Sequence, residues 1–294
     1  MNTIKASIGV IGGTGVYTVD NKEPIAVVNP ETDWGFPSDE IKIFEFERHG
    51  KSINVAFLPR HGMGHFHAPS KVPQKANLAA LKMLGVEEII AFSAVGSLKE
   101  EIEPRHFVLP SQIIDRTRHR EDTFFNEGIV MHASFGDPFS AELSNVCSRA
   151  LKKLGVPFHE EQTLIVMEGP LFSTRAESKL YRSWGAGIIN MTTIPEAKLA
   201  RELEISYQVI CMSTDYDSWR ESEESVTAEQ IMAVIKDNSQ NAQKVLNAVL
   251  EELIEVHPVE CPAKTAVRYS VITAPDKRPA AVSEKMKRLL PDIF

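Results

Sequence analysis

Short clusters of glycine, hydroxyl, basic and acidic residues follow directly after apolar runs of this chain. Four of them stand out: residues 12–15 (GGTG), 60–62 (RHG), 93–97 (SAVGS) and 213–217 (STDYD). Glycines let backbone N–H groups approach an anion, and hydroxyl groups add further donors. An arginine offers a fork of donors that suits phosphate, and paired carboxylates can supply an acid. Because ligands of open α/β sheets sit beyond the carboxyl ends of the strands, we expect these loops to converge on one site.

The glycine-rich cluster at residues 12–15 and the basic cluster at residues 60–62 each have another interpretation. The first is not a dinucleotide fingerprint, because the third glycine of G-x-G-x-x-G would fall at Thr18, although a plain tight turn stays possible. In the second, His61, His65 and His67 could bind a metal ion. That site requires a helix which the neighbouring glycines oppose, and no nearby carboxylate or cysteine completes it. We therefore expect no metal and favour an anion over a plain surface ion pair for Arg60.

The other two clusters also have plainer alternatives. Residues 93–97 are not the elbow of a serine hydrolase, because G-x-S-x-G is absent from the chain, but they could be a small-residue turn. Asp215 and Asp217 could belong to a solvated turn. Their position after a buried strand favours function, and a carboxylate in such a cleft can have a raised pKa.

The elements that position these clusters alternate in the manner of an α/β fold. Gly85 and Gly155 should end the first two predicted helices, and Thr227 with Gln230 predicts a capping box at the start of the third. Strands are expected at residues 7–11, 53–58, 89–92, 163–167, 187–190 and 207–212, and helices at 73–84, 143–154 and 227–253. Without repeats or linkers, residues 1–257 form one domain, and the proline-rich residues 258–294 form an appendage that packs on it or on a neighbouring subunit.

Composition excludes several classes of function. The 294 residues carry a formal net charge of −8, which argues against nucleic acid and membrane surfaces as partners, because both are polyanionic. No apolar run is long enough to span a bilayer, and the start of the chain lacks a secretory pattern. The cysteines Cys147, Cys211 and Cys261 are odd in number and far apart, as expected of reduced thiols in a cytoplasmic protein.

Several longer motifs resemble one family, the purine nucleoside phosphorylases, and among them most closely the 5′-methylthioadenosine phosphorylases. The resemblance runs in unbroken order from about Ile8 to Leu253. The matching motifs are residues 60–62 (RHG), 69–72 (PSKV), 76–77 (AN), 168–178 (EGPLFSTRAES), 184–186 (WGA), 189–196 (INMTTIPE) and 214–219 (TDYDSW). Three positions depart from the family pattern, namely Ser93, Val95 and Leu171, and the tail after about Pro258 differs from that of the animal enzymes.

The resemblance implies a single α/β domain with a central mixed β-sheet flanked by helices, assembled as a homotrimer. It implies no metal and no organic cofactor, with inorganic phosphate as the co-substrate of a purine nucleoside. Carried over by position, phosphate would contact Thr14, Arg60, His61, Ser93, Ala94 and Thr192. The nucleoside would contact Gly96, Phe172, Ser173, Met191, Asp215 and Asp217, with Ala228, Ile231 and Met232 around its 5′-substituent and His132 reaching in from a neighbouring subunit.

The implied reaction is phosphorolysis of 5′-methylthioadenosine to adenine and 5-methylthioribose 1-phosphate. Phosphate would attack the anomeric carbon while Asp215 donates a proton to N7 of the purine and Asp217 orients it. Relatives that act on inosine and guanosine carry asparagine in place of Asp215 and glutamate in place of Ser173, so a 6-amino purine is expected here. The alternatives are phosphorolysis of methylthioinosine, inosine or guanosine, a hydrolytic nucleosidase, a purine sensor without turnover and, least supported, a nicotinamide-dependent dehydrogenase.

Overall fold

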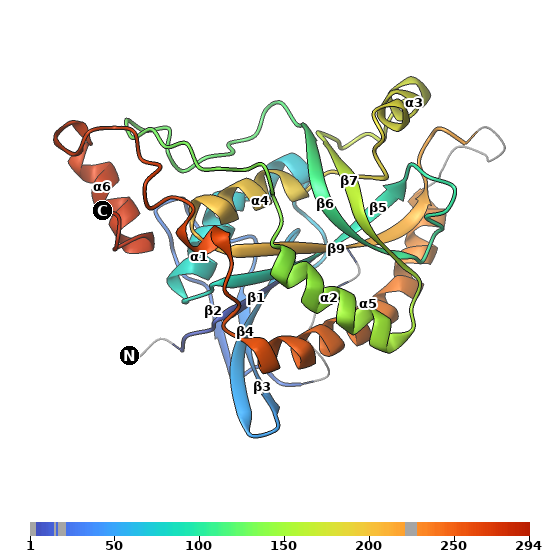
Figure 1. Cartoon of the computed structure of the whole chain (residues 1–294), viewed down its shortest axis with the longest axis horizontal. Coiled ribbons are helices and arrows are strands. Elements are labelled where there is room, and N and C mark those ends of the chain that lie inside the picture. The colour runs from blue at the N-terminus through green and yellow to red at the C-terminus, as the bar shows by residue number, and fades with distance from the viewer. Residues whose placement is uncertain (1–3, 15, 17–21, 221–227) are drawn as a thin grey trace.

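A mixed β-sheet forms the centre of the molecule, and helices cover both of its faces (Figure 1). The computed structural model describes residues 4–14, 16, 22–220 and 228–294, without the side chains of 228–233, 235 and 236. The described strands are β1 (Ile8–Gly12), β2 (Ala26–Val28), β3 (Ile41–Arg48), β4 (Lys51–Pro59), β5 (Glu88–Ser97), β6 (Phe107–Arg116), β7 (Phe158–Met167), β8 (Ile188–Asn190) and β9 (Ser206–Tyr216). The helices are α1 (Gln74–Met83), α2 (Ala141–Leu154), α3 (Arg175–Ser183), α4 (Thr193–Glu202), α5 (Ala228–Val256) and α6 (Ala280–Leu289).

Strand pairing brings the predicted clusters to one end of the sheet. The order is β2-β3-β4-β1-β5-β8-β7-β6-β9, and β9 also pairs with β5, so that the last five strands close on themselves. Strands β4, β1, β5 and β9 run parallel to one another. Their carboxyl ends, which carry the four polar clusters, therefore lie at the same edge. The expected α/β domain with a central mixed sheet is confirmed.

Two hydrophobic cores hold the helices against the sheet. One core lies between the sheet and α1, α4 and α6, and the other lies between the sheet and α2 and α5. Helix α2 shows how local sequence sets an element: the Ser140 hydroxyl accepts a hydrogen bond from the N–H of Leu143, a cap worth about 1 kcal/mol. Gly155 ends the helix at φ 65°, which a side chain would strain. The predicted end of this helix is confirmed.

Two of the predicted loops are strand. Residues 93–97 continue β5, and residues 213–216 continue β9, because the two strands stay paired past their apolar segments. The register shifts between Val95 and Gly96, where Thr214 is the extra residue, so the bulge lies in β9 directly before Asp215. Strands β2, β3 and β6 were not predicted. The proposed capping box at Thr227 lies outside the described residues.

The tail of residues 258–294 packs on the domain. Its residues Val267, Met286, Leu289 and Leu290 are buried in the core that also contains α1 and α4, and α6 contacts α1. Burying each such side chain contributes about 1.5–3 kcal/mol. The tail is therefore part of the domain's hydrophobic core in this structure.

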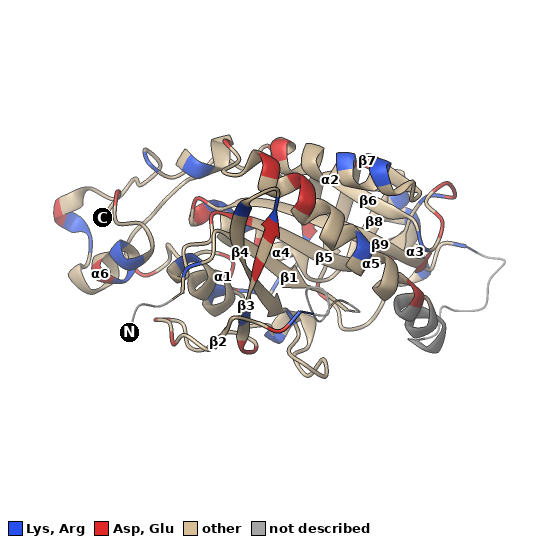
Figure 2. Ribbon diagram, turned by 90° about the horizontal axis from the view of Figure 1, so that it is seen from below, with Lys and Arg blue, Asp and Glu red and all other residues tan. Residues whose placement is uncertain are grey.

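Charged residues of both signs are interspersed along the molecule (Figure 2). Within the described part of the chain, no helix has both the length and the apolar character needed to cross a membrane.

Candidate active site

A cavity of about 500 Å³ opens at the carboxyl ends of β1, β4, β5 and β9. Eleven of the residues expected to contact phosphate or nucleoside line it: Thr14, Arg60, His61, Ser93, Ala94, Gly96, Phe172, Met191, Thr192, Asp215 and Asp217. The cavity has basic and hydroxyl groups toward β1 and β4 and carboxylates at the end of β9. It therefore joins an anion-binding end to an acidic end, as a two-substrate reaction requires.

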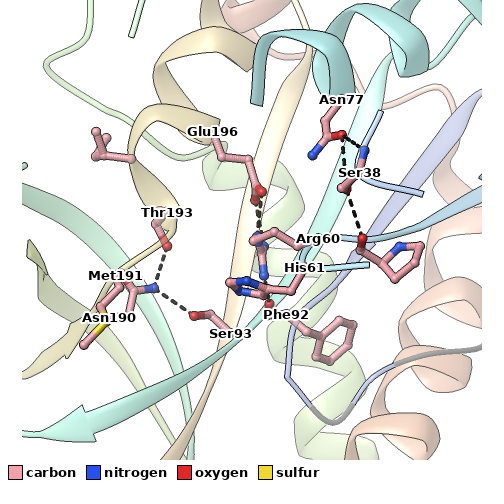
Figure 3. A network of polar contacts seen from close by, with 12 residues as sticks. Ser38, Arg60, His61, Asn77, Phe92, Ser93, Asn190, Met191, Thr193 and Glu196 are labelled. Atoms are coloured by element: carbon pink, nitrogen blue, oxygen red, sulfur yellow. Dashed lines mark hydrogen bonds and ion pairs between the residues drawn. The ribbon is translucent and has the colours of Figure 1, made fainter. Parts of the chain in front are cut away.

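The guanidinium of Arg60 is almost fully buried and is fixed by an acid that the sequence analysis did not assign. Its Nε and Nη2 donate to the two carboxylate oxygens of Glu196 at 2.7 and 2.8 Å, and Nη1 donates to the Phe92 carbonyl at 2.8 Å (Figure 3). Tyr207 donates its hydroxyl to the same carboxylate at 2.6 Å. Burial alone would lower the pKa of Arg60, but Glu196 holds that pKa above its ordinary value.

The alternative interpretation of Arg60 was a surface ion pair. Arg60 does have an acidic partner, Glu196, but this pair is buried and does not lie at the surface. Five N–H groups are available on a guanidinium, and three are engaged here, which leaves one on each terminal nitrogen for a ligand. Since Glu196 balances its charge, Arg60 supplies directional donors and little net charge.

The imidazole of His61 lies beside Arg60 and is held by its own loop. Its Nδ1 is 2.8 Å from the backbone oxygen of His67, and its ring stacks on that of His65 with centroids 4.1 Å apart. Burial, followed by the charge of Arg60, lowers the pKa of His61 to about 3. The ring is therefore neutral near pH 7. Among the described residues, no group of three or more His, Cys, Asp or Glu side chains is arranged to hold a metal ion.

Hydroxyl and amide groups complete this end of the cavity. Asn190, at the end of β8, donates its amide to the hydroxyls of Ser93 at 2.9 Å and Thr193 at 2.7 Å (Figure 3). Thr192 directly precedes α4, and no side-chain cap occupies that helix start. This helix start is interrupted by non-helical backbone angles at Ile194, so the hydroxyl groups are the donors typical of an oxyanion site here.

Glycine at position 13 allows the chain to approach the neighbouring strand closely. A β-carbon added to Gly13 would lie 2.2 Å from the Phe92 oxygen and 3.0 Å from Nη1 of Arg60. Any side chain there would displace β5 or the Arg60 guanidinium. The glycine cluster is thus needed for packing at the anion-binding end, while Gly15 lies outside the described residues.

Two carboxylates form the acidic end. Asp215 accepts a hydrogen bond from the Thr214 hydroxyl at 2.5 Å, and the N–H of Asp217 donates to the Ser97 oxygen at 3.0 Å. Burial raises the pKa of Asp217, while the nearby polar groups of Ser178, the Ser218 backbone and Ser173 oppose that rise. Its Oδ2 is buried without a hydrogen bond of good geometry. A buried carboxyl with a raised pKa suits the handling of a proton on a ligand.

Gly96 lies close to both acidic residues. A β-carbon at this position would lie 3.4 Å from Asp215 Oδ2 and 3.4 Å from the Asp217 β-carbon. The bulge in β9 pairs this glycine with Asp215.

Other predicted residues lie outside the cavity lining. Ser173 is buried behind the acids, where its carbonyl accepts from the Ser218 hydroxyl at 2.8 Å. His132 is exposed, away from the cavity, and its N–H donates to the Ser270 oxygen at 3.0 Å. The side chains of Ala228, Ile231 and Met232 lie outside the described residues, although their backbone belongs to α5.

A further buried arginine that was not predicted, Arg120, links two segments beside the cavity. Arg120 donates to the backbone oxygens of Met191 and Ile194, both at 2.6 Å, and of Glu168 at 2.6 Å. It thereby links the chain after β7 to the chain after β8. Only its position in a long segment without regular periodicity hinted at such a role, because its partners are carbonyl groups that no side-chain pattern reveals.

A mixed α/β sheet with an oxyanion end and an acidic end at the carboxyl edge of its parallel strands is the arrangement of an enzyme that transfers a group between a small anion and a second ligand. The chain belongs to the phosphorylase superfamily, whose family model matches residues 7–251. It is similar to the S-methyl-5′-thioadenosine phosphorylase of Emericella nidulans, with 50% identity over 98% of this chain and 83% of that one. It is also similar to the enzyme of that name from Candida albicans, with 48% identity over 97% of this chain and 88% of that one.

Solved structures agree in fold over nearly the whole chain. A methylthioadenosine phosphorylase from an antarctic soil metagenomic library superposes with a TM-score of 0.88 at 39% identity, covering 99% of both chains. The Schistosoma mansoni methylthioadenosine phosphorylase in complex with adenine has a TM-score of 0.80 at 28% identity, covering 98% of this chain and 99% of that one. The predicted family membership is confirmed.

Proposed function

We propose that this chain is an S-methyl-5′-thioadenosine phosphorylase, a pentosyltransferase that acts in purine and methionine salvage. It transfers the 5-methylthioribosyl group of 5′-methylthioadenosine to inorganic phosphate and releases adenine and 5-methylthioribose 1-phosphate. The observation that carries this proposal is the single cavity of about 500 Å³ in which Arg60 and His61 face the same space as Asp215 and Asp217. The relatives of that name, which are about half identical to this chain, support it.

At the basic end, phosphate would be bound by the two unengaged N–H groups of Arg60 and by donors around it. The remaining phosphate contacts in this proposal are Thr14, His61, Ser93, Ala94 and Thr192, all of which line the cavity. The fixed position of Arg60 holds the nucleophile in one place, which lowers the entropic cost of attack on the anomeric carbon. The anion also stabilises the positive charge that develops on the sugar.

At the acidic end, the purine would lie between Phe172 and the carboxylates, with Met191 beside the ribose. Asp215 and Asp217 act on the base: one donates a proton to N7, and the other orients it or accepts from the 6-amino group. The burial of Asp217, which raises its pKa, supports a protonated carboxyl at this end of the cavity. Ser173 lies behind the acids, where the relatives that act on inosine and guanosine carry glutamate. No glutamate at this position therefore faces the base.

The wall around the 5′-substituent would come from Ala228, Ile231 and Met232, and from His132 of a neighbouring subunit in a homotrimer. Exposed apolar side chains at the cavity mouth support a covering subunit. Phe66 is 65% exposed and Phe172 54% exposed, although both line the cavity, and the adjacent Leu171 is 81% exposed. Large apolar surfaces of this kind are typical of interfaces.

The reaction as proposed needs phosphate as co-substrate and no metal or organic cofactor. We place the enzyme in the cytoplasm, which its free cysteines Cys147, Cys211 and Cys261 support. Neither nucleic acid nor membrane is proposed as a partner, given the net charge of −8.

Adenine release from 5′-methylthioadenosine, followed with and without phosphate, tests the proposal. We expect release only when phosphate or arsenate is present, at a rate that saturates with the anion. Equal rates in phosphate-free buffer would replace the proposal with a hydrolytic nucleosidase. Tight adenine binding without turnover would replace it with a sensor.

A further inference from the structure

The tautomer of His61 is set by a backbone carbonyl. Its Nδ1 lies 2.8 Å from the His67 oxygen, and a carbonyl oxygen can only accept, so Nδ1 carries the proton. In the neutral ring, Nε2 is then a hydrogen-bond acceptor. Among the described residues Nε2 has no hydrogen-bond partner, and it is not one of the fully buried polar atoms. It is therefore the nitrogen that the cavity-lining ring leaves for a ligand.

The groups around the ring keep it neutral. Burial and the adjacent Arg60 hold the pKa of His61 at about 3, and the rings of His65 and His67 also lower this pKa. A ring that is neutral near pH 7 and has its proton on Nδ1 offers a lone pair, not an N–H, to the cavity.

The rest of the oxyanion end adds no net positive charge that would compensate for the neutral His61 ring. Glu196 engages two nitrogens of Arg60 at 2.7 and 2.8 Å, and both side chains are almost fully buried, with 1% and 0% exposure. The pair together is neutral. The site therefore discriminates among oxyanions by hydrogen-bond polarity more than by total charge.

We propose that His61 accepts a hydrogen bond from a protonated oxygen of the bound anion, so that the site selects oxyanions that carry a proton. This inference rests on the proposed function for the identity of the anion as phosphate. Hydrogen phosphate and hydrogen arsenate carry such a proton near pH 7, whereas sulfate is fully deprotonated. A sulfate oxygen would face the Nε2 lone pair. Sites that leave a buried polar group unmatched in this way discriminate by roughly tenfold to a hundredfold or more.

Calorimetric titration of the intact protein at pH 7 and constant ionic strength, with phosphate, arsenate and sulfate as probes, tests the inference. We expect arsenate to bind within a few-fold of phosphate and sulfate at least tenfold more weakly. His61→Gln places an amide where Nε2 stood, and this amide can rotate to donate, so the affinity for sulfate relative to that for phosphate should rise toward unity. His159→Gln, the same substitution outside the cavity, should leave the ratio as in the wild type.

Equal affinities of the wild-type protein for sulfate and phosphate would overturn the inference. So would a ¹⁵N NMR spectrum of histidine-labelled protein that shows His61 as the doubly protonated imidazolium in the phosphate complex. This spectrum needs no variant, so it decides the matter even if His61→Gln does not fold. Failure of the proposed function has a different signature, namely absence of phosphate-dependent adenine release, and the affinity ratio still decides the role of His61.

Discussion

Replacing Glu196 by glutamine should destabilise the protein strongly, because it leaves the Arg60 charge buried without a counter-charge. Glu196 is 0% exposed and Arg60 1% exposed, and two hydrogen bonds of 2.7 and 2.8 Å join them. In Glu196→Gln an NH2 group replaces one of the two acceptor oxygens, so one N–H donor of Arg60 faces another donor. Removing one partner of a buried ion pair costs about 3–5 kcal/mol. We expect a loss of this size in the free energy of unfolding, measured by urea denaturation without phosphate.

Phosphate should restore part of that loss. With Glu196 neutral, the guanidinium charge is available to the anion, so saturating phosphate should raise the stability of Glu196→Gln more than that of the wild type. The matched control is Glu160→Gln, which removes an exposed carboxylate 3.6 Å from Lys152 and should cost less than about 1 kcal/mol. A loss below about 1 kcal/mol for Glu196→Gln, or an unchanged response to phosphate, would refute the reasoning.

Three further predictions concern specificity, pH and assembly. Asp215→Asn should lower kcat/KM for 5′-methylthioadenosine by roughly tenfold to a hundredfold and raise the relative rate on inosine, since an amide can pair with a 6-oxo group; unchanged selectivity in initial-rate assays would contradict this. Burial, with Asp122 nearby, raises the pKa of Glu202 to about 7 from 4.5, so its contribution to stability is complete below pH 4.5 and is lost as the pH rises through 7. Glu202→Gln should flatten that decline in urea titrations at pH 5 and pH 8, and parallel curves for both proteins would disprove it. Light scattering should give about three times the chain mass of 32.8 kDa, whereas a fully active monomer would rule out a role for His132 of a neighbouring subunit.

The sequence predicted the sheet edge and most of the cavity because these depend on local patterns. Apolar runs followed by glycine, hydroxyl or charged residues located the carboxyl ends of β1 and β4 to within one residue, and the polar segments of β5 and β9 that face the cavity. Helix ends such as Gly155 are likewise encoded by one residue and its neighbours. Where a strand continues through polar residues, as β5 does from Ser93 to Ser97, the pattern indicated a loop, because the pairing with β9 that keeps it extended is not local.

The partners of buried charges could not be predicted for the same reason. Arg60 and Glu196 are 136 positions apart and meet only when α4 packs beside the sheet. Arg120 binds backbone carbonyls, which every residue carries, so no side-chain pattern marks its partners. The packing of the tail, residues 258–294, was also not evident from its sequence. Its prolines indicated irregular chain, while the buried face of α6 comprises only a few residues, including Met286 and Leu289.

The fate of phosphate tests the central claim most directly. ³¹P NMR of the purified protein with 5′-methylthioadenosine and phosphate should show inorganic phosphate consumed and a sugar phosphate monoester formed, each in equal amount to the adenine released. Adenine release with no loss of inorganic phosphate and no new phosphorus signal would contradict the account.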